Sequence, residues 1–426
     1  MIRRLALLML LPAVAVPLPA TFAQGADDSG VADLILLKAG KVYLTPDESL
    51  DNGEILIRNG RIVSIGTDLS APEGATVIER PEGTVTAGLI DANSTAGYRS
   101  ARSRAEHRSE CIPELHVLDT LDLGSRDFDQ LASSGVTTVY VSADSASVIG
   151  AQGAILHTGG PRDRRVVRKA YGIKATIGRE PVYKASRNRG PFGIVSYLTR
   201  RPTTRMGLVW VFRKAFHDAA LASRGQTPET HGEGTPSEAS IQVLIRVLKG
   251  EIPLRIQARA QLDILTAIRL GREFNVSFIL EEGTDAYRCI DVLRENKVPV
   301  IYGPLFDYPR GARAGSGEAN RYRYSAPAAL LKGGITLALS ANDLGGEASL
   351  PRQAMYAMRF GLTRAQALAA VTVTPARLLE IEDVAGLIAE GRPADIVLWS
   401  GEPFAATARA EAVVIGGHLV KRPNTE

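Results

Sequence analysis

The chain has 426 residues, which is enough for one large domain and a smaller one. Its composition, 45% hydrophobic and 23% charged, is ordinary for a folded protein. The 50 Lys and Arg residues barely exceed the 46 Asp and Glu residues, so charge gives no support for a nucleic-acid or anionic-membrane partner. Two distant cysteines, Cys111 and Cys289, exclude a disulfide framework, and we expect two separate thiols.

The N-terminus has the layout of a secretory signal peptide. Arg3 and Arg4 precede an apolar run that reaches "ATFA", so we expect cleavage after Ala23. A retained membrane anchor is disfavoured because three prolines break the run, which is short for a spanning helix. We therefore predict a signal peptide over residues 1–23, no stable membrane span, and export to the periplasm or the extracellular space.

Both ends of the remaining chain are rich in short strands and turns. The dipeptide Asn59-Gly60 predicts a hairpin turn because both residues tolerate positive φ, and Gly416-Gly417 predicts a second one. The two β-rich ends can pair with each other. We therefore predict one small composite β-sandwich domain made from residues 32–86 and 377–426.

The middle of the chain alternates between strand-like and helix-like runs. Examples of the strand-like runs are "GVTTVYVS", "PLRIQA" and "ITLALSA", and helix-like runs such as "QLDILTAIRLGREF" lie between them. Repeated strand–helix alternation favours a parallel sheet covered by helices. The number of units favours an α/β fold with a TIM-type (β/α)₈ barrel over residues 87–376.

Several sequence segments, in their order along the chain, resemble those of the amidohydrolase superfamily, in its imidazolonepropionase-like branch. The resemblance runs from Ala32 to Arg422 and includes "GEILIRNGRIVSIG", "TAGLIDA", "GIKATIG", "FILEEGTDAY" and "GLIAEGRPADIVLW". It implies a hydrolase of non-peptide carbon–nitrogen bonds. In that family a divalent metal, typically zinc, lies at the carboxyl ends of the barrel strands and activates a bound water.

The family's site residues can be transferred to this sequence one position at a time. The first-strand histidine pair falls on Asn93 and Thr95, the strand-five histidine on Gln257, and the strand-six histidine on Glu282. The last-strand carboxylate falls on Asn342, or on Asp343 after a slip of one residue, and both alternatives stay open. Lys174 lies near the position of a carboxylated bridging lysine in some relatives, although an ordinary strand-end lysine is the simpler interpretation.

No histidine stands at any of the four family histidine positions. Neutral Asn, Thr and Gln side chains are poor zinc ligands beside imidazole, which disfavours the family's metal centre. None of the chain's six histidines belongs to an H-x-H or H-E-x-x-H pair. The resemblance therefore implies a family site in which the metal ligands are replaced.

Three functional interpretations remain open at this stage. The first is a pseudoenzyme that binds a small molecule in the barrel mouth without hydrolysing it. The second is a hydrolase with a changed site, in which oxygen ligands hold Ca²⁺ or Mg²⁺, or in which Glu282 and Asp343 act as a metal-free acid–base pair.

The third interpretation is a surface interaction protein of the cell envelope. Its basic surface would include Arg164, Arg165 and Arg168 in "GGPRDRRVVRK", together with "KASRNRG". Because many barrels of the superfamily self-associate, a homo-oligomer is a further expectation.

Overall fold

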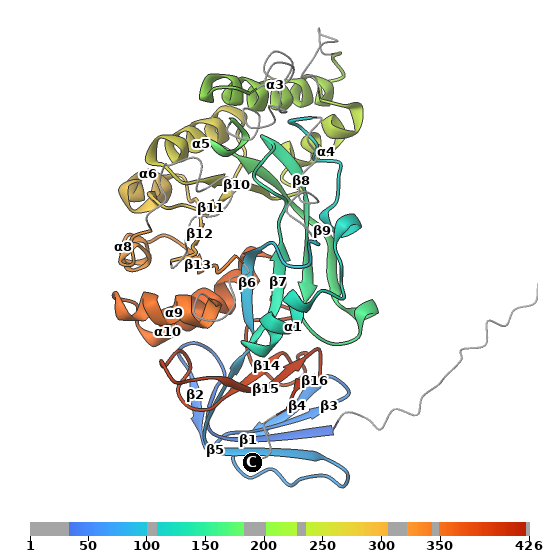
Figure 1. The fold of residues 1–426 in the computed structure, drawn as a ribbon, viewed down its shortest axis with the longest axis vertical. Helices are drawn as coiled ribbons and strands as arrows, with labels where there is room; N and C mark the ends of the chain where they lie inside the picture. The colour runs from blue at the N-terminus through green and yellow to red at the C-terminus, as the bar shows by residue number, and fades with distance from the viewer. Residues whose placement is uncertain are drawn as a thin grey trace, which may run out of the picture. The chain divides into compact units, whose positions relative to one another are not determined.

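The computed structural model describes residues 34–99, 109–182, 202–227, 236–305, 322–342 and 349–422. These residues form two sheets of eight strands each, together with the helices that cover the second sheet (Figure 1). The predicted signal peptide lies outside the described residues. Within the described ranges, every helix is too short or too polar to cross a membrane.

The first sheet joins the two ends of the chain, which confirms the predicted β-domain. Its strand order is β16-β15-β14-β5-β1-β3-β4, with β2 paired to β1. Figure 1 shows the blue N-terminal strands beside the dark red C-terminal ones. The domain boundaries themselves stay a prediction, and the strands are β1 (Leu34–Tyr43), β2 (Ser49–Asp51), β3 (Glu54–Arg58), β4 (Arg61–Gly66), β5 (Thr76–Ala87), β14 (Ile396–Trp399), β15 (Ala410–Ile415) and β16 (His418–Lys421).

Both predicted hairpin turns are present, and they touch each other. Asn59 and Gly60 have φ of 50° and 78°, and Gly416 and Gly417 have φ of 54° and 84°. A Cβ added to Gly417 would lie 1.9 Å from the Cα of Gly60. Only a glycine fits this approach, because any side chain at position 417 would overlap the other turn.

The core of this sheet is apolar. Residues from the N-terminal strands and the C-terminal strands bury their side chains in one cluster, which contains Ile, Leu, Val and Ala at its fully buried positions. Burial of such side chains is the main stabilising contribution in a small sheet domain. The members from β1, β3, β5, β14 and β15 include Ile35, Leu37, Ile55, Ile57, Val85, Ile396, Leu398 and Val414.

The second sheet is the predicted barrel, with one difference from the regular pattern. Its order is β6 to β13 in sequence, and every neighbouring pair is parallel except that β8 runs antiparallel to both β7 and β9. A hairpin strand therefore stands where the regular fold has a strand–helix unit. The strands are β6 (Leu89–Ser94), β7 (Val136–Val141), β8 (Ile149–His157), β9 (Val166–Thr176), β10 (Leu254–Ala258), β11 (Phe278–Glu282), β12 (Val300–Tyr302) and β13 (Leu337–Leu339).

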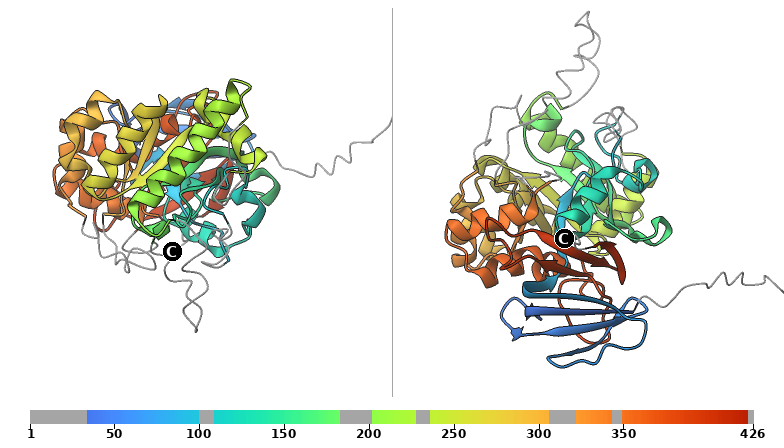
Figure 2. Two further views of the ribbon diagram at one scale, coloured as in Figure 1. Left: turned by 90° about the horizontal axis from the view of Figure 1, so that it is seen from above. Right: turned by 60° about the horizontal axis from the view of Figure 1, so that its bottom comes forward.

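Helices cover the outer face of this sheet, as Figure 2 shows from two further sides. The largest buried cluster packs outward-facing strand residues, such as Leu254, Ile256 and Leu280, against the helices. The helices are α1 (Arg126–Ser133), α3 (Arg205–Ser223), α4 (Glu238–Leu248), α5 (Gln261–Phe274), α6 (Ile290–Glu295), α8 (Ala326–Lys332), α9 (Leu350–Arg359), α10 (Arg364–Val371) and α11 (Val373–Leu378).

Asp395, just before β14, ties the two sheets together. Its backbone oxygen accepts a hydrogen bond from Gly88 at 2.8 Å, and its Oδ1 accepts one from the Gly416 backbone at 2.6 Å. His157, the last residue of β8, places Nδ1 3.5 Å from Asp395 Oδ2. His157 is thus part of the junction between the sheets.

Candidate functional site

The predicted site residues cluster at the carboxyl ends of the barrel strands, the edge where such barrels carry their sites. Gln257 pairs in register with Thr176 on β9 and with Glu281 on β11. Ala258, one residue later, pairs with Glu282. The strand register therefore brings the ends of β9, β10 and β11 to one level of the barrel mouth.

A cluster of fully buried charges lies below this level, inside the barrel. The Lys174 Nζ contacts Glu281 Oε2, and Arg255 Nε donates to Glu281 Oε1 at 2.6 Å. Arg255 Nη2 also donates to the Ala92 backbone oxygen at 2.5 Å, which links the cluster to β6. Burial alone would raise the pKa of Glu281, but the positive charges of Lys174 and Arg255 outweigh it and hold the pKa below its ordinary value.

Two glycines make room for Arg255 and its aromatic neighbour. The Arg255 guanidinium lies over the ring of Tyr140, 3.7 Å from the ring centroid. A Cβ on Gly172 would lie 2.8 Å from Arg255 Cδ, and a Cβ on Gly153 would lie 2.2 Å from the Tyr140 hydroxyl oxygen. The small residues on β8 and β9 therefore leave the space that the Tyr140 ring of β7 and the buried Arg255 side chain occupy.

A second charged cluster lies at the ends of β9, β10 and β11. The Arg259 guanidinium contacts the Glu180 carboxylate, and its Nε lies 3.5 Å from Glu282 Oε2. All three side chains are buried. Glu282 has φ of 67°, which is rare for a residue with a side chain and is typical of strained functional or switch positions.

The ends of β6 and β13 are held together by polar contacts. Asp91 Oδ2 accepts a hydrogen bond from the Ala341 backbone at 3.0 Å, and Asp91 Oδ1 accepts one from the Asn93 backbone at 3.1 Å. Ser340 Oγ donates to the Asn93 backbone oxygen at 2.9 Å. Asp91 on β6 therefore helps to hold the ends of β6 and β13 together.

Two predicted site residues have side-chain amides that make no hydrogen bond within the described ranges. Asn93 is 3% exposed and Gln257 is 4% exposed. Neither amide makes a hydrogen bond to any part of the chain that the structure describes. A nearly buried amide without a partner is costly unless water or a ligand satisfies it, so these two side chains mark the polar part of the mouth.

The remaining predictions are placed as follows. Lys174 is a buried ion-pair partner rather than a strand-end lysine at the surface, and Thr95 is half-buried after β6. Asn342 follows β13 with φ of 51°. Asp343 lies outside the described residues, so the choice between it and Asn342 stays open.

Sequence reasoning missed Glu281, Arg255 and Glu180. A signal for Glu281 was present, because side chains alternate along a strand and position 281 shares the inward face with Ile279. Arg255 gave little signal, because arginine is almost never fully buried unless it is paired.

Cys111 and Cys289 are separate buried thiols, as predicted. Burial raises the pKa of both thiols, that of Cys289 to about 11. A thiol in such surroundings is a poor nucleophile, and neither cysteine enters the site.

Two arginines of "GGPRDRRVVRK", Arg165 and Arg168, contact the protein's own backbone. Arg165 Nη1 donates to the Leu123 oxygen at 2.7 Å, and Arg168 Nη2 donates to the Glu380 oxygen at 2.5 Å. The second basic segment, "KASRNRG", lies outside the described residues. Arg165 and Arg168 thus serve to hold the β8–β9 hairpin in place.

Comparison with known proteins agrees with this architecture. A model of the "Amidohydrolase family" matches residues 333–421. The crystal structure of an amidohydrolase from Thermotoga maritima MSB8 superposes with a TM-score of 0.78 at 27% identity, covering 91% of this chain and all of that one. The chain belongs to the amidohydrolase superfamily. The predicted fold is confirmed.

Two curated amidohydrolase relatives are similar over shorter stretches. The amidohydrolase tasK of Hapsidospora irregularis is 25% identical over 305 residues, which is 67% of this chain and 30% of that protein. An imidazolonepropionase of Paracidovorax citrulli (strain AAC00-1) is 38% identical over 107 residues, or 22% of this chain and 25% of the enzyme. The chain therefore spans less than a third of the length of either relative, and the second one supports the imidazolonepropionase-like branch.

The residues that the structure describes at the barrel mouth do not fit the amidohydrolase metal. No three His, Cys, Asp or Glu side chains converge on one point anywhere in the described ranges. Lys174 and Arg255 already neutralise Glu281, and Arg259 lies beside Glu282. What Asn93 and Gln257 offer is amide oxygen, which is a weak donor for zinc.

Proposed function

We propose that this amidohydrolase-like chain binds a polar small molecule in the barrel mouth and does not carry out metal-dependent hydrolysis. The observation that carries the proposal is the pair of nearly buried amides, Asn93 and Gln257, without partners in the described chain. Each amide offers both a donor and an acceptor, so together they suit a ligand that carries amide, imide or lactam groups. Such a ligand agrees with descent from hydrolases of carbon–nitrogen bonds.

The charge clusters support binding over catalysis. A general base works best with a pKa near the working pH, whereas the pKa of Glu281 is held below its ordinary value. Glu282 lies beside Arg259, whose Nε is 3.5 Å from Glu282 Oε2, so the ion pair holds this side chain in a fixed position. The metal-free acid–base interpretation pairs Glu282 with Asp343, which lies outside the described residues, and the ion pair of Glu282 with Arg259 makes that interpretation the weaker one.

The proposal includes export of the mature chain after removal of residues 1–23. Support comes from the sequence alone, through the two arginines, the short apolar run and the small residues at the cleavage position. The ligand would then be met in the periplasm or outside the cell.

The test uses mature protein and a panel of lactams, cyclic imides, N-acyl amino acids, dipeptides and esters. We expect at least one amide-bearing compound to raise the melting temperature without being hydrolysed. The Gln257→Leu variant should lose this ligand-dependent rise. The matched control, Gln130→Leu, changes an exposed glutamine of α1 and should keep it.

Two results would contradict the proposal. The first is hydrolysis of a panel compound at a rate that scales with bound zinc, manganese or iron. The second is turnover that Glu282→Gln abolishes, which would restore the interpretation as a hydrolase with a changed site.

A further inference from the structure

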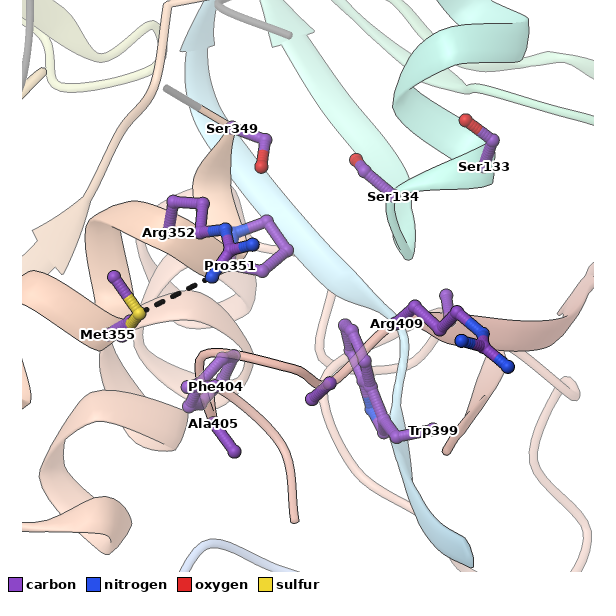
Figure 3. Close-up of a pocket in the computed structure, with 12 residues that line it drawn as sticks. Ser133, Ser134, Ser349, Pro351, Arg352, Met355, Trp399, Phe404, Ala405 and Arg409 are labelled. Atoms are coloured by element: carbon purple, nitrogen blue, oxygen red, sulfur yellow. Dashed lines mark hydrogen bonds between the residues drawn. The ribbon is translucent and has the colours of Figure 1, made fainter. Parts of the chain in front are cut away.

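A small cavity and a larger groove lie away from the barrel mouth. The small cavity, of about 120 Å³, lies between α1, α9 and the segment that joins β14 to β15, and Figure 3 shows its lining. Its Arg352 donates Nη1 to Met355 Sδ at 3.5 Å, the dashed line in Figure 3, and to the Ala406 oxygen at 2.7 Å. The arginine of the small cavity is therefore held by the chain itself.

The larger groove has a volume of about 470 Å³ and lies at the amino ends of three barrel strands. Leu254 and Phe278 in its wall begin β10 and β11, and Pro299 directly precedes β12. The candidate functional site lies at the carboxyl ends of the same strands, so the groove is separate from it. Its volume falls within the range of about 300–1,000 Å³ that is typical of small-molecule pockets.

The floor of the groove is apolar. Five lining side chains are buried and four more are half-buried, and all nine are aliphatic or aromatic: Val247, Ile252, Leu254, Phe278 and Ile279, then Leu248, Pro253, Val276 and Pro299. A ligand that covers such a surface gains free energy because it removes apolar area from water.

The rim of the groove is positively charged. Lys249 follows α4 and Lys297 lies just after α6, and the lining includes no Asp or Glu. No carboxylate in the part of the chain that the structure describes pairs with either ammonium group. Glu251, two residues after Lys249, pairs with Arg246 at 3.2 Å instead. The groove therefore combines an apolar floor with two cations that the described chain does not neutralise.

The backbone at Lys297 supports a role for its side chain. Three residues at the helix ends beside this groove have positive φ, namely Gly250 at 75°, Asn275 at 53° and Lys297 at 54°. Glycine and asparagine adopt this conformation readily, whereas lysine does so at a cost. The lysine at position 297 thus supplies a charge to the rim where glycine or asparagine would suit the backbone better.

We propose that this groove binds a small carboxylic acid with an apolar body. The carboxylate would contact the lysine ammonium groups at the rim, and the hydrocarbon part would cover the apolar floor. Charge complementarity selects this class, because a cationic molecule of the same shape would be repelled and a neutral one would lack the charge contact. The proposal does not depend on what the barrel mouth binds.

The test titrates the protein with octanoate by calorimetry and compares octanol and octylamine, which carry the same chain with no charge and with a positive charge. We expect saturable binding of octanoate with a negative heat-capacity change from burial of apolar surface. Octanol should bind more weakly, and octylamine should not bind. The affinity for octanoate should fall as salt is added, because salt screens the contact between exposed charges.

Two variants locate the bound octanoate. Lys297→Asn and Lys249→Gln should each weaken its binding by about three- to tenfold, since each removes a charge-assisted contact. Lys297→Asn should fold normally because asparagine tolerates positive φ, as Asn275 does. Lys332→Gln, the matched control, removes an exposed lysine from the last turn of α8, outside the groove, and should keep the parent affinity.

Three results would overturn the proposal. The first is the absence of saturable octanoate binding by the parent protein. The second is equal octanoate affinity of the parent, Lys297→Asn and Lys249→Gln, because the bound carboxylate would then lie elsewhere. The third is equal binding of octylamine and octanoate, because the rim charges would then play no part.

Discussion

The interiors of the two sheets differ in whether they bury a cluster of charges. In the β-domain the buried cluster contains aliphatic side chains from both ends of the chain. In the barrel, Lys174, Arg255 and Glu281 are buried together in the middle of the sheet. Both sheets have eight strands, so strand number does not account for the difference.

The aliphatic core and the buried charge cluster should respond differently to substitutions. An aliphatic core loses stability gradually as methyl groups are removed. A buried charge cluster tolerates no missing member, because each remaining charge then lacks compensation in a medium of low polarity. The barrel interior should therefore be sensitive to single changes of charge, and the β-domain should be sensitive to changes of volume.

The largest effect is expected from Glu281→Gln. This change leaves Lys174 and Arg255 buried without their shared carboxylate. Unfolding in urea should show a loss of about 3–5 kcal/mol in the free energy of unfolding. The same substitution in an exposed pair, Glu251→Gln beside Arg246, should cost less than about 1 kcal/mol. Similar losses in the two variants would show that the buried ion pairs contribute no more to the free energy of unfolding than the exposed pair does.

The difference between the parent and Glu281→Gln should depend on pH. The pKa of Glu281 is lowered in the folded state, so its contribution is complete above the unfolded value of about 4.3. That contribution is lost as the pH falls through the folded pKa. Urea unfolding at several pH values measures the difference in the free energy of unfolding between the parent and the variant. This difference should be constant near neutrality and become smaller in acid. A difference in unfolding free energy that grows in acid would contradict the assigned direction of the pKa shift.

Gly153→Ala should cost about 1–3 kcal/mol of unfolding free energy. Its new Cβ would lie 2.2 Å from the Tyr140 hydroxyl oxygen, and the Arg255 guanidinium restrains that ring on its face. Gly401→Ala is the control, because a Cβ at position 401 meets no atom within 4 Å. Denaturant unfolding of both variants measures the effect, and equal stabilities would show that the Tyr140 ring can move.

Ile57→Val tests the β-domain and should have the smallest effect. Ile57 is fully buried among aliphatic neighbours, and loss of one methylene there should cost about 1 kcal/mol. This loss should be independent of pH between neutrality and acid, unlike that of Glu281→Gln. A comparable pH dependence in Ile57→Val would mean that acid acts on the whole molecule rather than on the charge cluster.

Much of the fold could be predicted from the sequence because its signals are local. The Asn59-Gly60 turn needs only the tolerance of two residues for positive φ, and both residues adopt it. The direction of β8 had no such signal. Its run "IGAQGAILH" is apolar and contains two glycines, and the need for Gly153 appears only when the Tyr140 ring is in place.

The site was harder to predict because it depends on contacts between strands. Alternation along β11 directs Glu281 inward, but the positive φ of Glu282 changes the direction of the chain at the next residue. Burial of Arg255 requires the space above Gly172 and the ring of Tyr140, which come from two other strands. Residue type alone therefore identified the replaced ligand positions without revealing the charge cluster beside them.

The most direct test of the central claim is elemental analysis of mature protein purified without chelators or added metals. If the charge clusters stand in place of the family's metal centre, zinc, manganese and iron should each be far below one atom per chain. Chelator treatment should then leave the melting temperature unchanged. One tightly held zinc, manganese or iron per chain, with a lower melting temperature after its removal, would contradict the account.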